Sequence, residues 1–497
     1  MTYKKSFLIL FILIFSVVQI FIAATPVSAE APKSDDRFLS FGDVNQDGVI
    51  RVDDCSAIQQ HLSKINELSR VGYLLADADK NGTVNITDVT LIQEYLARIV
   101  TGLPEGTKNE SLKNALNVKD FGAKGDGFAD DSTAFKSCLK AAEGNPVLVP
   151  PGTYAVNSCK FDPNIPVKLI GQGSPVITRN QPPSAYQALF TFSNTPSAYI
   201  SGLTFDCKRD DFTVKATAEK DIHGNTIEAE EYDEWVNTSC LYFKEGAKNV
   251  TVKNCLFKNC SREGIVCAYG NFSNLDIKNN IFYNTSDCLW LTSGIKDSYS
   301  TFNHIYFNNN YCEEGRTIGV EFDNRRYNGV DSVAKDIQIR GNVFSNFVKC
   351  AVKLVCCEDV LIENNSYTFR ETLFEKARSK TDSFHFTFVA AIGNKGECDT
   401  VRCKNITVKN NRGKAETPFQ LRAPSGEAVT ATLFENITFA ENEFDCKYKL
   451  AAVEYSDGVN ITDNLYSIYD EKYKPNFKLY NNLNSENINE SNNTLKN

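Results

Sequence analysis

The 497-residue sequence has little methionine, tryptophan and histidine, and it has no excess of positive charge. It contains one Met, two Trp and four His, and the His residues are too scattered to complete a zinc-binding pattern with cysteine. A net charge of −9 at pH 7 provides no electrostatic surface for nucleic acid, although an acidic chain can still bind an acidic polymer in a locally basic cleft. No segment beyond the N-terminal region is apolar enough to span a bilayer.

The N-terminus has the pattern of an export signal at residues 1–29. Lys4 and Lys5 form a basic start, an apolar segment follows from Phe7 to Ile22, and Val27-Ser28-Ala29 form a small-residue cleavage site. A transmembrane anchor is the alternative, but the short basic start and the cleavage site favour a signal peptide. The sequence therefore predicts a secreted, extracellular protein.

Two runs with the same spacing of oxygen-bearing side chains lie 34 residues apart. Each run has oxygen ligands at loop positions 1, 3, 5 and 12, a backbone carbonyl at position 7, and glycine at position 6 for the sharp turn. Because this spacing surrounds a hard cation with oxygen atoms, we predict two Ca²⁺ sites. The predicted ligands are Asp43, Asn45, Asp47, Val49 and Asp54 in the first loop and Asp77, Asp79, Asn81, Thr83 and Asp88 in the second.

The duplicated loop and helix unit resembles a type I dockerin over residues 40–103. The resemblance implies a small all-α module on the N-terminal side that binds a cohesin module of a scaffoldin. It also implies that recognition depends on loop positions 10 and 11, which are Val52, Asp53, Ile86 and Thr87 here. We therefore expect attachment to an extracellular complex of the cellulosome type.

A second resemblance begins after a polar segment at residues 104–116 that is typical of a linker. A Gly-rich turn leads to a cap at Asp131-Ser132, a helix through Ala142, and a strand and turn at Val147–Tyr154. This arrangement is similar to the N-terminal signature of the pectate-lyase-like superfamily. The resemblance implies a mainly β fold, a right-handed parallel β-helix over residues 117–469, which acts on polysaccharide, most commonly of the pectic type.

An internal repeat supports a solenoid independently. An apolar residue is followed three positions later by Asn at seven places, and repeat periods in this range indicate stacked coils. Asn in register predicts a hydrogen-bonded ladder, and the longest step leaves room for two coils. Residues 470–497 are rich in Asn, Ser, Glu and Lys and predict a disordered or loosely packed polar tail. The seven are Asn280, Asn310, Asn342, Asn365, Asn411, Asn442 and Asn464.

Sixteen cysteines in an exported chain raise the question of disulfides. Half of them lie inside the strand-like repeats rather than in loops, so we expect most to be buried, reduced and packed as small apolar side chains. Disulfide pairing remains the alternative.

Outward side chains on neighbouring coils form columns, because coils stack at the strand spacing of about 4.8 Å. Aligning four successive strands by their inward apolar pairs places Trp290, Glu321 and Lys353 in one outward column. Glu263 and Asp287 precede two of the pairs and form the best candidate acid/base couple, because glycosidases use one protonated and one ionised carboxylate. Solvated strand carboxylates are the alternative interpretation.

Further polar side chains near this column are candidate substrate contacts. Asp323 is a second alternative carboxylate, and Trp290 is placed to stack on a sugar ring or to lie beneath a loop. Arg316, Arg325 and Arg326 are candidates for a clamp on sugar carboxylates, with a solvated loop as the alternative for the last two.

The run around Asp287 and Cys288 looks like the polygalacturonase motif in which paired Asp residues precede Cys. The departures are large: Ser286 replaces one Asp, Gly315-Arg316-Thr317 stands near the place of the family's Gly-His-Gly, and Lys353 matches its Arg-Ile-Lys only loosely.

Three functions follow from these patterns. The first is a scaffold-attached glycoside hydrolase in which Asp287 and Glu263 share the acid and base roles. The second is a polysaccharide lyase in which Lys353, Arg325 or Arg326 removes a proton beside a uronate carboxylate, with one further Ca²⁺ or an Arg neutralising the charge. The third is a carbohydrate-binding or structural solenoid without catalysis.

Overall fold

The computed structural model describes residues 41–45, 50–68, 70–79, 83–97, 99, 114–172, 175–183, 186–216, 232–235, 238–293, 299–327, 329–370, 386–393, 397, 399–424 and 428–496. The predicted export signal and most of the predicted linker lie outside these residues. A search of the described helices finds none with the length and apolar character that crossing a membrane requires.

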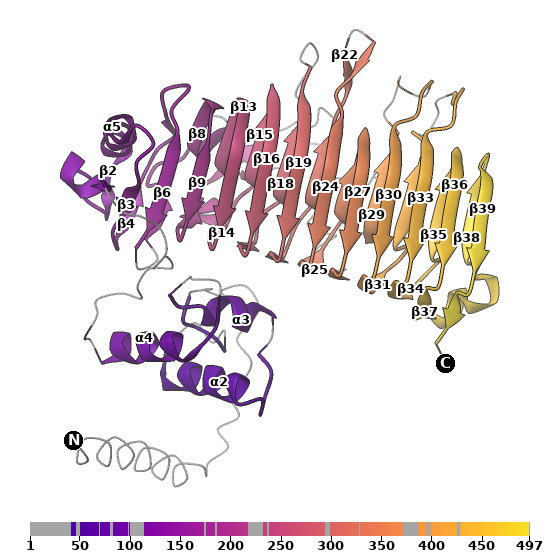
Figure 1. Ribbon diagram of the computed structural model, residues 1–497, viewed down its shortest axis with the longest axis horizontal. Coiled ribbons are helices and arrows are strands. Elements are labelled where there is room, and N and C mark those ends of the chain that lie inside the picture. Colours follow the sequence, from indigo (N-terminus) through magenta and orange to yellow (C-terminus); the bar gives the residue numbers. More distant parts are fainter. Residues whose placement is uncertain are drawn as a thin grey trace. The chain divides into compact units, whose positions relative to one another are not determined.

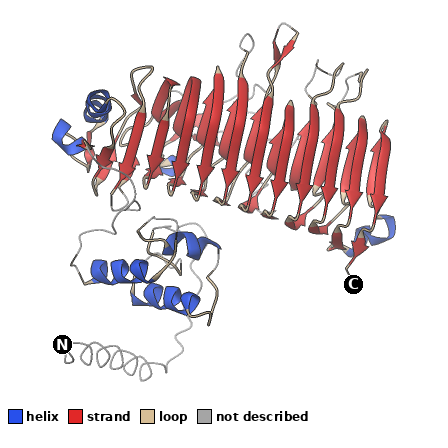
Figure 2. Ribbon diagram, in the orientation of Figure 1, coloured by secondary structure: helices blue, strands red, loops and turns tan. Residues whose placement is uncertain are grey.

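The described residues of the N-terminal module include the helices α2 (Val52–Leu62), α3 (Arg70–Ala76) and α4 (Ile86–Leu96), which Figure 2 shows in blue. Cys55 and Ile58 of α2 and Val89 and Ile92 of α4 are buried together in one small apolar cluster. Each predicted loop therefore leads into a helix whose apolar side packs on its counterpart.

The rest of the chain is a right-handed parallel β-helix. Each complete coil contributes one strand to each of three parallel faces, and Figure 1 shows successive strands side by side in chain order from β6 to β39. The coil crosses the first face, turns to the second, and returns through the third. The predicted fold class is confirmed, and the bounds of the strands follow face by face.

The first face carries the predicted column. Its strands are β5 (Cys159–Lys160), β8 (Gln187–Thr195), the first half of β13 (Thr238–Lys253), β15 (Glu263–Ala268), β18 (Asp287–Thr292), β21 (Ile318–Asp323), β26 (Cys350–Leu354), β29 (Thr387–Ile392), β32 (Phe419–Arg422), β35 (Ala451–Glu454) and β38 (Tyr480–Leu483).

The second face begins near the linker and includes the second half of β13. Its other strands are β1 (Leu116–Asn117), β3 (Val147–Val149), β6 (Val167–Gly171), β9 (Ala198–Ser201), β16 (Asn271–Lys278), β19 (Thr301–Asn308), β24 (Ala334–Arg340), β27 (Cys357–Glu363), β30 (Cys403–Lys409), β33 (Phe434–Ala440), β36 (Ser456–Thr462) and β39 (Glu486–Ser491).

The third face is a separate sheet of shorter strands. They are β2 (Asp126–Asp130), β4 (Thr153–Ala155), β7 (Val176–Thr178), β10 (Thr204–Asp206), β14 (Leu256–Lys258), β17 (Ile281–Tyr283), β20 (Tyr311–Glu313), β25 (Val343–Phe347), β28 (Ser366–Phe369), β31 (Arg412–Ala415), β34 (Glu443–Cys446), β37 (Leu465–Ile468) and β40 (Thr494–Leu495).

A few short elements lie outside the three faces. Two antiparallel hairpins interrupt the coils, and three 3₁₀ turns occur at the ends of strands. They are β11 (Thr213–Ala216) with β12 (Tyr232–Trp235), β22 (Arg326–Tyr327) with β23 (Val330–Asp331), η1 (Val118–Phe121), η2 (Arg209–Asp211) and η3 (Glu471–Asn476).

The predicted helix covers the first coil, as the superfamily resemblance implied. This helix is α5 (Ser132–Ala142), and its Phe135, Cys138 and Leu139 are fully buried in the core of the β-helix. Without such a cap the apolar interior would be open to water at the first coil. Residue Asp131 precedes the helix, and its carboxylate accepts hydrogen bonds from the Lys124 and Gly125 amides instead of capping the helix.

Apolar side chains stack from coil to coil in the interior. The rings of Phe205, Phe257 and Phe282 lie nearly parallel, with centroids 5.1 Å and 4.8 Å apart. These separations match the spacing of paired strands. The interior therefore repeats the strand register side chain by side chain.

A continuous ladder of Asn side chains confirms the predicted repeat. Each ladder Asn donates its side-chain amide to the side-chain oxygen of the next, as from Asn280 to Asn310 at 3.1 Å and from Asn310 to Asn342 at 3.2 Å. The Asn310 oxygen also accepts the backbone amide of Asn280 at 3.0 Å. All seven predicted residues belong to the ladder, and Asn493 extends it by one coil.

Two sequence predictions about the solenoid are wrong. Asn365 donates directly to Asn411 at 2.9 Å, so the 46-residue step is one coil with a long excursion and not two coils. Residues 470–497 are not a loose tail, because β38, β39 and β40 pair with the preceding coil. That prediction rested on the polar composition of these residues. The last coil is polar because few neighbours cover it, and not because it is unfolded.

The left-handed backbone positions lie one residue before the ladder. The residue before each ladder Asn, and not the ladder Asn itself, has a positive φ, as in Asn279 at 53° and Asn309 at 56°. Asn at the first position tolerates the left-handed turn. The second Asn is then free to point inward and bond along the stack.

We predict that Asn310→Ala destabilises the β-helix strongly. The change removes the acceptor of the buried Asn280 backbone amide and the side-chain donor to the buried Ile277 carbonyl, and each buried unsatisfied group costs about 1–3 kcal/mol. Urea unfolding should show a clearly lower midpoint. Asn303→Ala, at a half-buried position of the same strand stack, is the control, and an equal shift in both variants would contradict a ladder role.

Candidate functional site

The first face brings the predicted catalytic residues together. Trp290 pairs in register with Glu321, and Glu321 pairs with Lys353, so the predicted column exists. Glu263 and Asp287 are direct register partners on neighbouring coils. The candidate site therefore spans four coils, on β15, β18, β21 and β26.

Glu263 lies at the buried end of this site. Its side chain is 1% exposed, and Arg262 Nε lies 3.2 Å from its Oε1. Its Oε2 accepts hydrogen bonds from Ser239 at 2.5 Å and from Tyr186 at 3.1 Å. These are the contacts that an ionised carboxylate makes, and they leave little room for water or a sugar.

Asp287 lies one coil further along and is slightly exposed. Burial raises the pKa of Asp287, and the neighbouring Glu263 charge raises it further, whereas hydrogen bonds from Thr317 and Ile318 oppose both effects. The Ile318 amide donates to Asp287 Oδ1 at 2.9 Å. The raised pKa favours a carboxyl that holds its proton.

Glu321 and Lys353 form a close ion pair on the next two coils. Lys353 Nζ lies 2.6 Å from Glu321 Oε1 and 3.9 Å from Asp323 Oδ1. Burial raises the pKa of Glu321, and the Lys353 charge opposes that rise. Burial alone would lower the pKa of Lys353, but Glu321 and Asp323 outweigh burial and raise it.

Trp290 is half-buried between the two groups of charges. The Arg262 guanidinium lies 5.8 Å from the centre of the Trp290 ring, within the range of a cation–π contact. Among the described residues the indole N–H has no hydrogen-bond partner. The ring is therefore packed on one side by Arg262, with its polar edge unbonded.

The three predicted arginine contacts have different surroundings. Arg325 is exposed and lies 3.2 Å from Asp323, close to the carboxylates. Arg316 is half-buried in the turn before β21. The Arg326 guanidinium instead pairs with Asp331 at 3.0 Å and Asp399 at 2.7 Å. It fastens the β22–β23 hairpin to a neighbouring segment and does not face the carboxylates.

Sequence reasoning missed several residues of the site. Tyr186 and Ser239 lie 77 and 24 residues before Glu263, and no local motif links them to it. Arg262 was not missed: the sequence places it next to Glu263 and near the candidate carboxylates, and the structure pairs it with Glu263. Thr317 belongs to the Gly315-Arg316-Thr317 run that stands near the place of the family's Gly-His-Gly. Its hydroxyl donates a hydrogen bond to Asp287.

Four carboxylates and two cations thus follow one face over neighbouring coils. The pKa of Asp287 is raised beside the arginine-paired Glu263, and the pKa of Glu321 on the next coil is also raised, although Lys353 opposes that rise. Neighbouring carboxyls with different partners are what acid–base chemistry on a glycosidic bond requires.

The described ligands of the two cation loops fit calcium. Oxygen atoms of Asp77, Asp79 and Asp88 converge within 4.8 Å of one another, and all three residues are buried. In the first loop Asp43 and Asp54 are fully buried. Asp47, Val49 and Asn81 lie outside the described residues. Buried carboxylates that converge in this way suit a hard divalent cation, so Ca²⁺ when bound would hold each loop against its helix.

The predicted partner residues lie on the surface of the module. Val52 and Ile86 are 48% and 61% exposed, although both begin helices. Asp53 is exposed and Thr87 is half-buried. Large apolar side chains at such exposure mark a candidate docking surface.

Comparison with known families identifies both parts of the chain. Residues 41–97 match the model of the dockerin type I domain, and residues 115–338 match that of rhamnogalacturonase A/epimerase, pectate lyase-like. The chain therefore has a type I dockerin domain followed by a pectate-lyase-like domain.

Individual relatives are distant. Plasmin and fibronectin-binding protein A of Streptococcus pneumoniae is 23% identical over 293 residues, or 52% of this chain, and the match spans 40% of that protein's length. The mannuronan C-5 epimerase AlgE6 A-module of Azotobacter vinelandii is 16% identical, with TM-score 0.48, over 77% of this chain and 99% of that one. A family 28 exopolygalacturonase of Yersinia enterocolitica is 12% identical, with TM-score 0.41, over 77% and 78%.

We predict that the full chain binds two Ca²⁺ ions and that Asp88→Ala loses one of them. Asp88 is the closing ligand of the second loop, where its carboxylate meets Asp77 and Asp79. Calcium titration calorimetry after treatment with EGTA measures the number of sites. Glu94→Gln, on the same helix but outside the loop, should keep both sites, and an unchanged count in Asp88→Ala would contradict the assignment.

Proposed function

We propose that the β-helix hydrolyses a glycosidic bond of a plant cell-wall polysaccharide, of the pectic type, at the first face. The observation that carries this proposal is the pairing of Glu263 with Asp287 on neighbouring coils, where burial and the Glu263 charge raise the pKa of Asp287. A carboxyl with a raised pKa is the kind of group that a glycosidase needs to protonate its leaving oxygen.

In this mechanism Asp287 donates a proton to the glycosidic oxygen. Glu321 takes the base role, because it lies on the next coil and Lys353 at 2.6 Å opposes the rise in pKa that burial causes there. Glu263 is a positioning residue whose negative charge keeps Asp287 protonated, since its own side chain is 1% exposed. This assignment moves the base role from Glu263, where the sequence had suggested it, to Glu321.

The substrate assignment rests on the charges beside the carboxylates and on the family match. Arg325 is exposed near Asp323 and is free to reach a sugar carboxylate, as guanidinium groups do. Trp290 provides an aromatic surface for a sugar ring.

The lyase alternative requires a neutral base, and the geometry disfavours Lys353 for that role. Its two carboxylate neighbours raise its pKa, so it stays protonated at neutral pH. Arg326 is engaged by Asp331 and Asp399. Only Arg325 among the three candidate bases remains exposed beside the site.

A second candidate function is binding without catalysis. The match to the streptococcal protein, whose name describes plasmin and fibronectin binding, favours this candidate. In that case the same face would hold a polymer through Trp290, Arg325 and the ion pairs and would leave its bonds intact. Mass analysis of incubated pectic polymers separates the outcomes, because hydrolysis adds one water to each product and a lyase step adds none.

The dockerin domain gives the proposed enzyme its location. Binding to a cohesin of a scaffoldin would hold the β-helix in an extracellular complex of the cellulosome type beside its polymer. The export signal predicted at residues 1–29 is consistent with this location.

We predict that Asp287→Asn lowers the rate of hydrolysis by about 10² to 10⁴, the usual cost of losing a proton-transfer group. Product formation from pectic polymer, followed by mass, measures the change. The wild-type rate should fall as pH rises through the raised pKa of Asp287, because only the protonated carboxyl donates. In Glu263→Gln this fall should move to lower pH, since the charge that raises the pKa of Asp287 is removed.

Asp276→Asn is the matched control, because Asp276 lies on β16 of the second face at the same level of the stack. It should retain full activity. If Asp287→Asn and Glu321→Gln both still form products, the catalytic site lies elsewhere. If wild-type protein binds the polymers but forms no product of either mass, the second candidate replaces the first.

We also predict that the two cohesin-contact pairs are unequal. Val52-Asp53 carries a charge, whereas Ile86-Thr87 does not and exposes a larger apolar side chain. Alanine substitution of the two pairs separately should therefore lower cohesin affinity by different factors in surface plasmon resonance. Equal losses would count against distinct binding orientations.

A further inference from the structure

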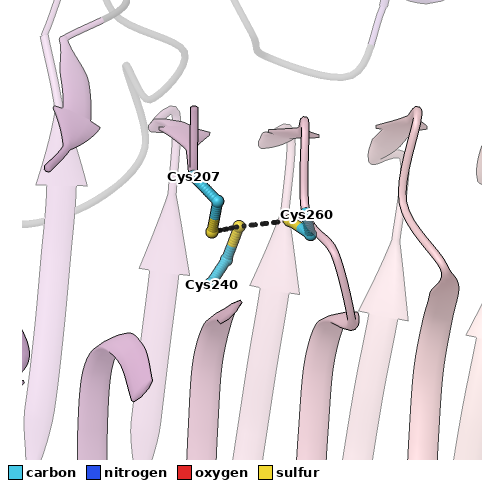
Figure 3. A group of neighbouring side chains, drawn as sticks. All are labelled: Cys207, Cys240 and Cys260. Carbon is cyan, nitrogen blue, oxygen red and sulfur yellow. Dashed lines mark hydrogen bonds between the residues drawn. The ribbon is translucent and has the colours of Figure 1, made fainter. Parts of the chain in front are cut away.

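Three cysteines from neighbouring coils meet in the core of the β-helix, away from the first-face site. Cys207 follows β10, Cys240 lies in β13, and Cys260 follows β14. Figure 3 shows their sulfur atoms turned toward one another. All three side chains are fully buried. We name this group the thiol triad.

The sulfur atoms of the triad are close enough to share one ion. Cys207 Sγ lies 3.6 Å from Cys240 Sγ, and Cys240 Sγ lies 3.1 Å from Cys260 Sγ. All three atoms lie within 4.8 Å of one another. Thiolates bound at about 2.3 Å to a tetrahedral ion are separated by about 3.8 Å, so only small movements are needed.

A buried arginine next to the triad provides the second observation. Arg179 follows β7, the strand that pairs with β10, and its side chain is fully buried. Among the described residues, its Nε and Nη2 atoms have no hydrogen-bond partner and no carboxylate forms an ion pair with it. Burial lowers the pKa of Arg179, and the three thiols are the groups that oppose this fall.

This arrangement leaves a buried positive charge without an evident counter-ion. The cost of burying a guanidinium is large unless a negative group compensates it. Arg402 is also fully buried and shows how a buried guanidinium is usually compensated. Asp331 and Glu397 each lie 2.6 Å from its nitrogen atoms. At Arg179 the described part of the chain offers only sulfur.

We propose that Cys207, Cys240 and Cys260 are the ligands of one divalent d¹⁰ metal ion, Zn²⁺ or Cd²⁺, held in the core of the β-helix. Three thiolates around a divalent ion carry one net negative charge, which the Arg179 guanidinium neutralises. A monovalent ion such as Cu⁺ would leave the group negatively charged. Soft thiolate ligands select ions of this class over Ca²⁺.

Binding releases three protons, one from each thiol, to solvent, and three sulfur–metal bonds form without any change of oxidation state. Three protein ligands leave the fourth position of the ion to a neutral water molecule, which keeps the charge balance with Arg179. Because the triad is fully buried, the ion enters as these coils fold. The bound ion then stabilises the fold and takes no part in catalysis. Whether the ion binds is therefore independent of whether the first face is catalytic.

The test begins with the full wild-type chain, produced in zinc-supplemented medium and treated with EGTA to strip the dockerin calcium. We expect about one zinc per chain by mass spectrometry of the elements. Refolding in Cd²⁺ should give a sulfur-to-cadmium charge-transfer band in the ultraviolet, and X-ray absorption at the cadmium edge should count three sulfur neighbours.

Single variants then identify the ligands. Cys207→Ser, Cys240→Ser and Cys260→Ser should each lose the bound ion, whereas Cys446→Ser, at a buried cysteine outside the triad, should retain it. Arg179→Met should lower metal retention, because the bound group would keep an uncompensated negative charge. Should a triad variant fail to fold, the sulfur count of the wild-type cadmium protein decides the matter alone.

Three results would overturn the proposal. The first is wild-type protein that holds neither zinc nor cadmium under these conditions. The second is full metal retention in Cys207→Ser. The third is a Cys240–Cys260 cross-linked peptide in the wild-type protein, because a disulfide would remove two of the three thiolate ligands.

Discussion

Each interior coil of the β-helix pairs in parallel with the coils on both sides, and this pairing fixes where almost every side chain lies. Strand spacing sets the separation of stacked rings such as Phe257 and Phe282 at 4.8 Å. It also brings each ladder Asn within hydrogen-bond distance of the next, and Glu263 beside Asp287. The strand register therefore determines how the core packs, how the turns bond to one another and which side chains meet in the candidate site.

The same spacing explains the electrostatics of the first face. Carboxylates one coil apart in register cannot avoid one another's charge, so each needs a partner or a proton. Glu263 has Arg262 and Glu321 has Lys353, whereas Asp287 lies between them with hydrogen bonds but no cation in contact among the described residues. A raised pKa at Asp287 follows from its place in the stack, and a candidate acid is the result.

The sequence allowed the fold and the column to be predicted because both depend on local periodicity. The alternation of apolar and polar residues within a strand predicted which side chains point outward, and the repeated Asn predicted where the ladder lies. Contacts made by excursions from the coil were beyond such reasoning, because nothing local links Tyr186 to Glu263 across 77 residues. Arg326 looked like a substrate clamp for the same reason, since its partners Asp331 and Asp399 lie in such excursions. The thiol triad was missed because Cys207 and Cys240 are 33 residues apart and match no metal-ligand spacing.

The two fully buried arginines show how a solenoid core accommodates charge. Arg402 lies where loops approach the coil, and these loops supply Asp331 and Glu397. Arg179 lies near the first coils, where the residues that face inward are apolar or sulfur-bearing, and a carboxylate there would itself need a partner. Cysteine packs as a small apolar side chain when neutral and becomes an anion when a cation or a metal stabilises it. A group of thiols thus lets the core remain apolar in most coils and carry compensating charge where Arg179 enters.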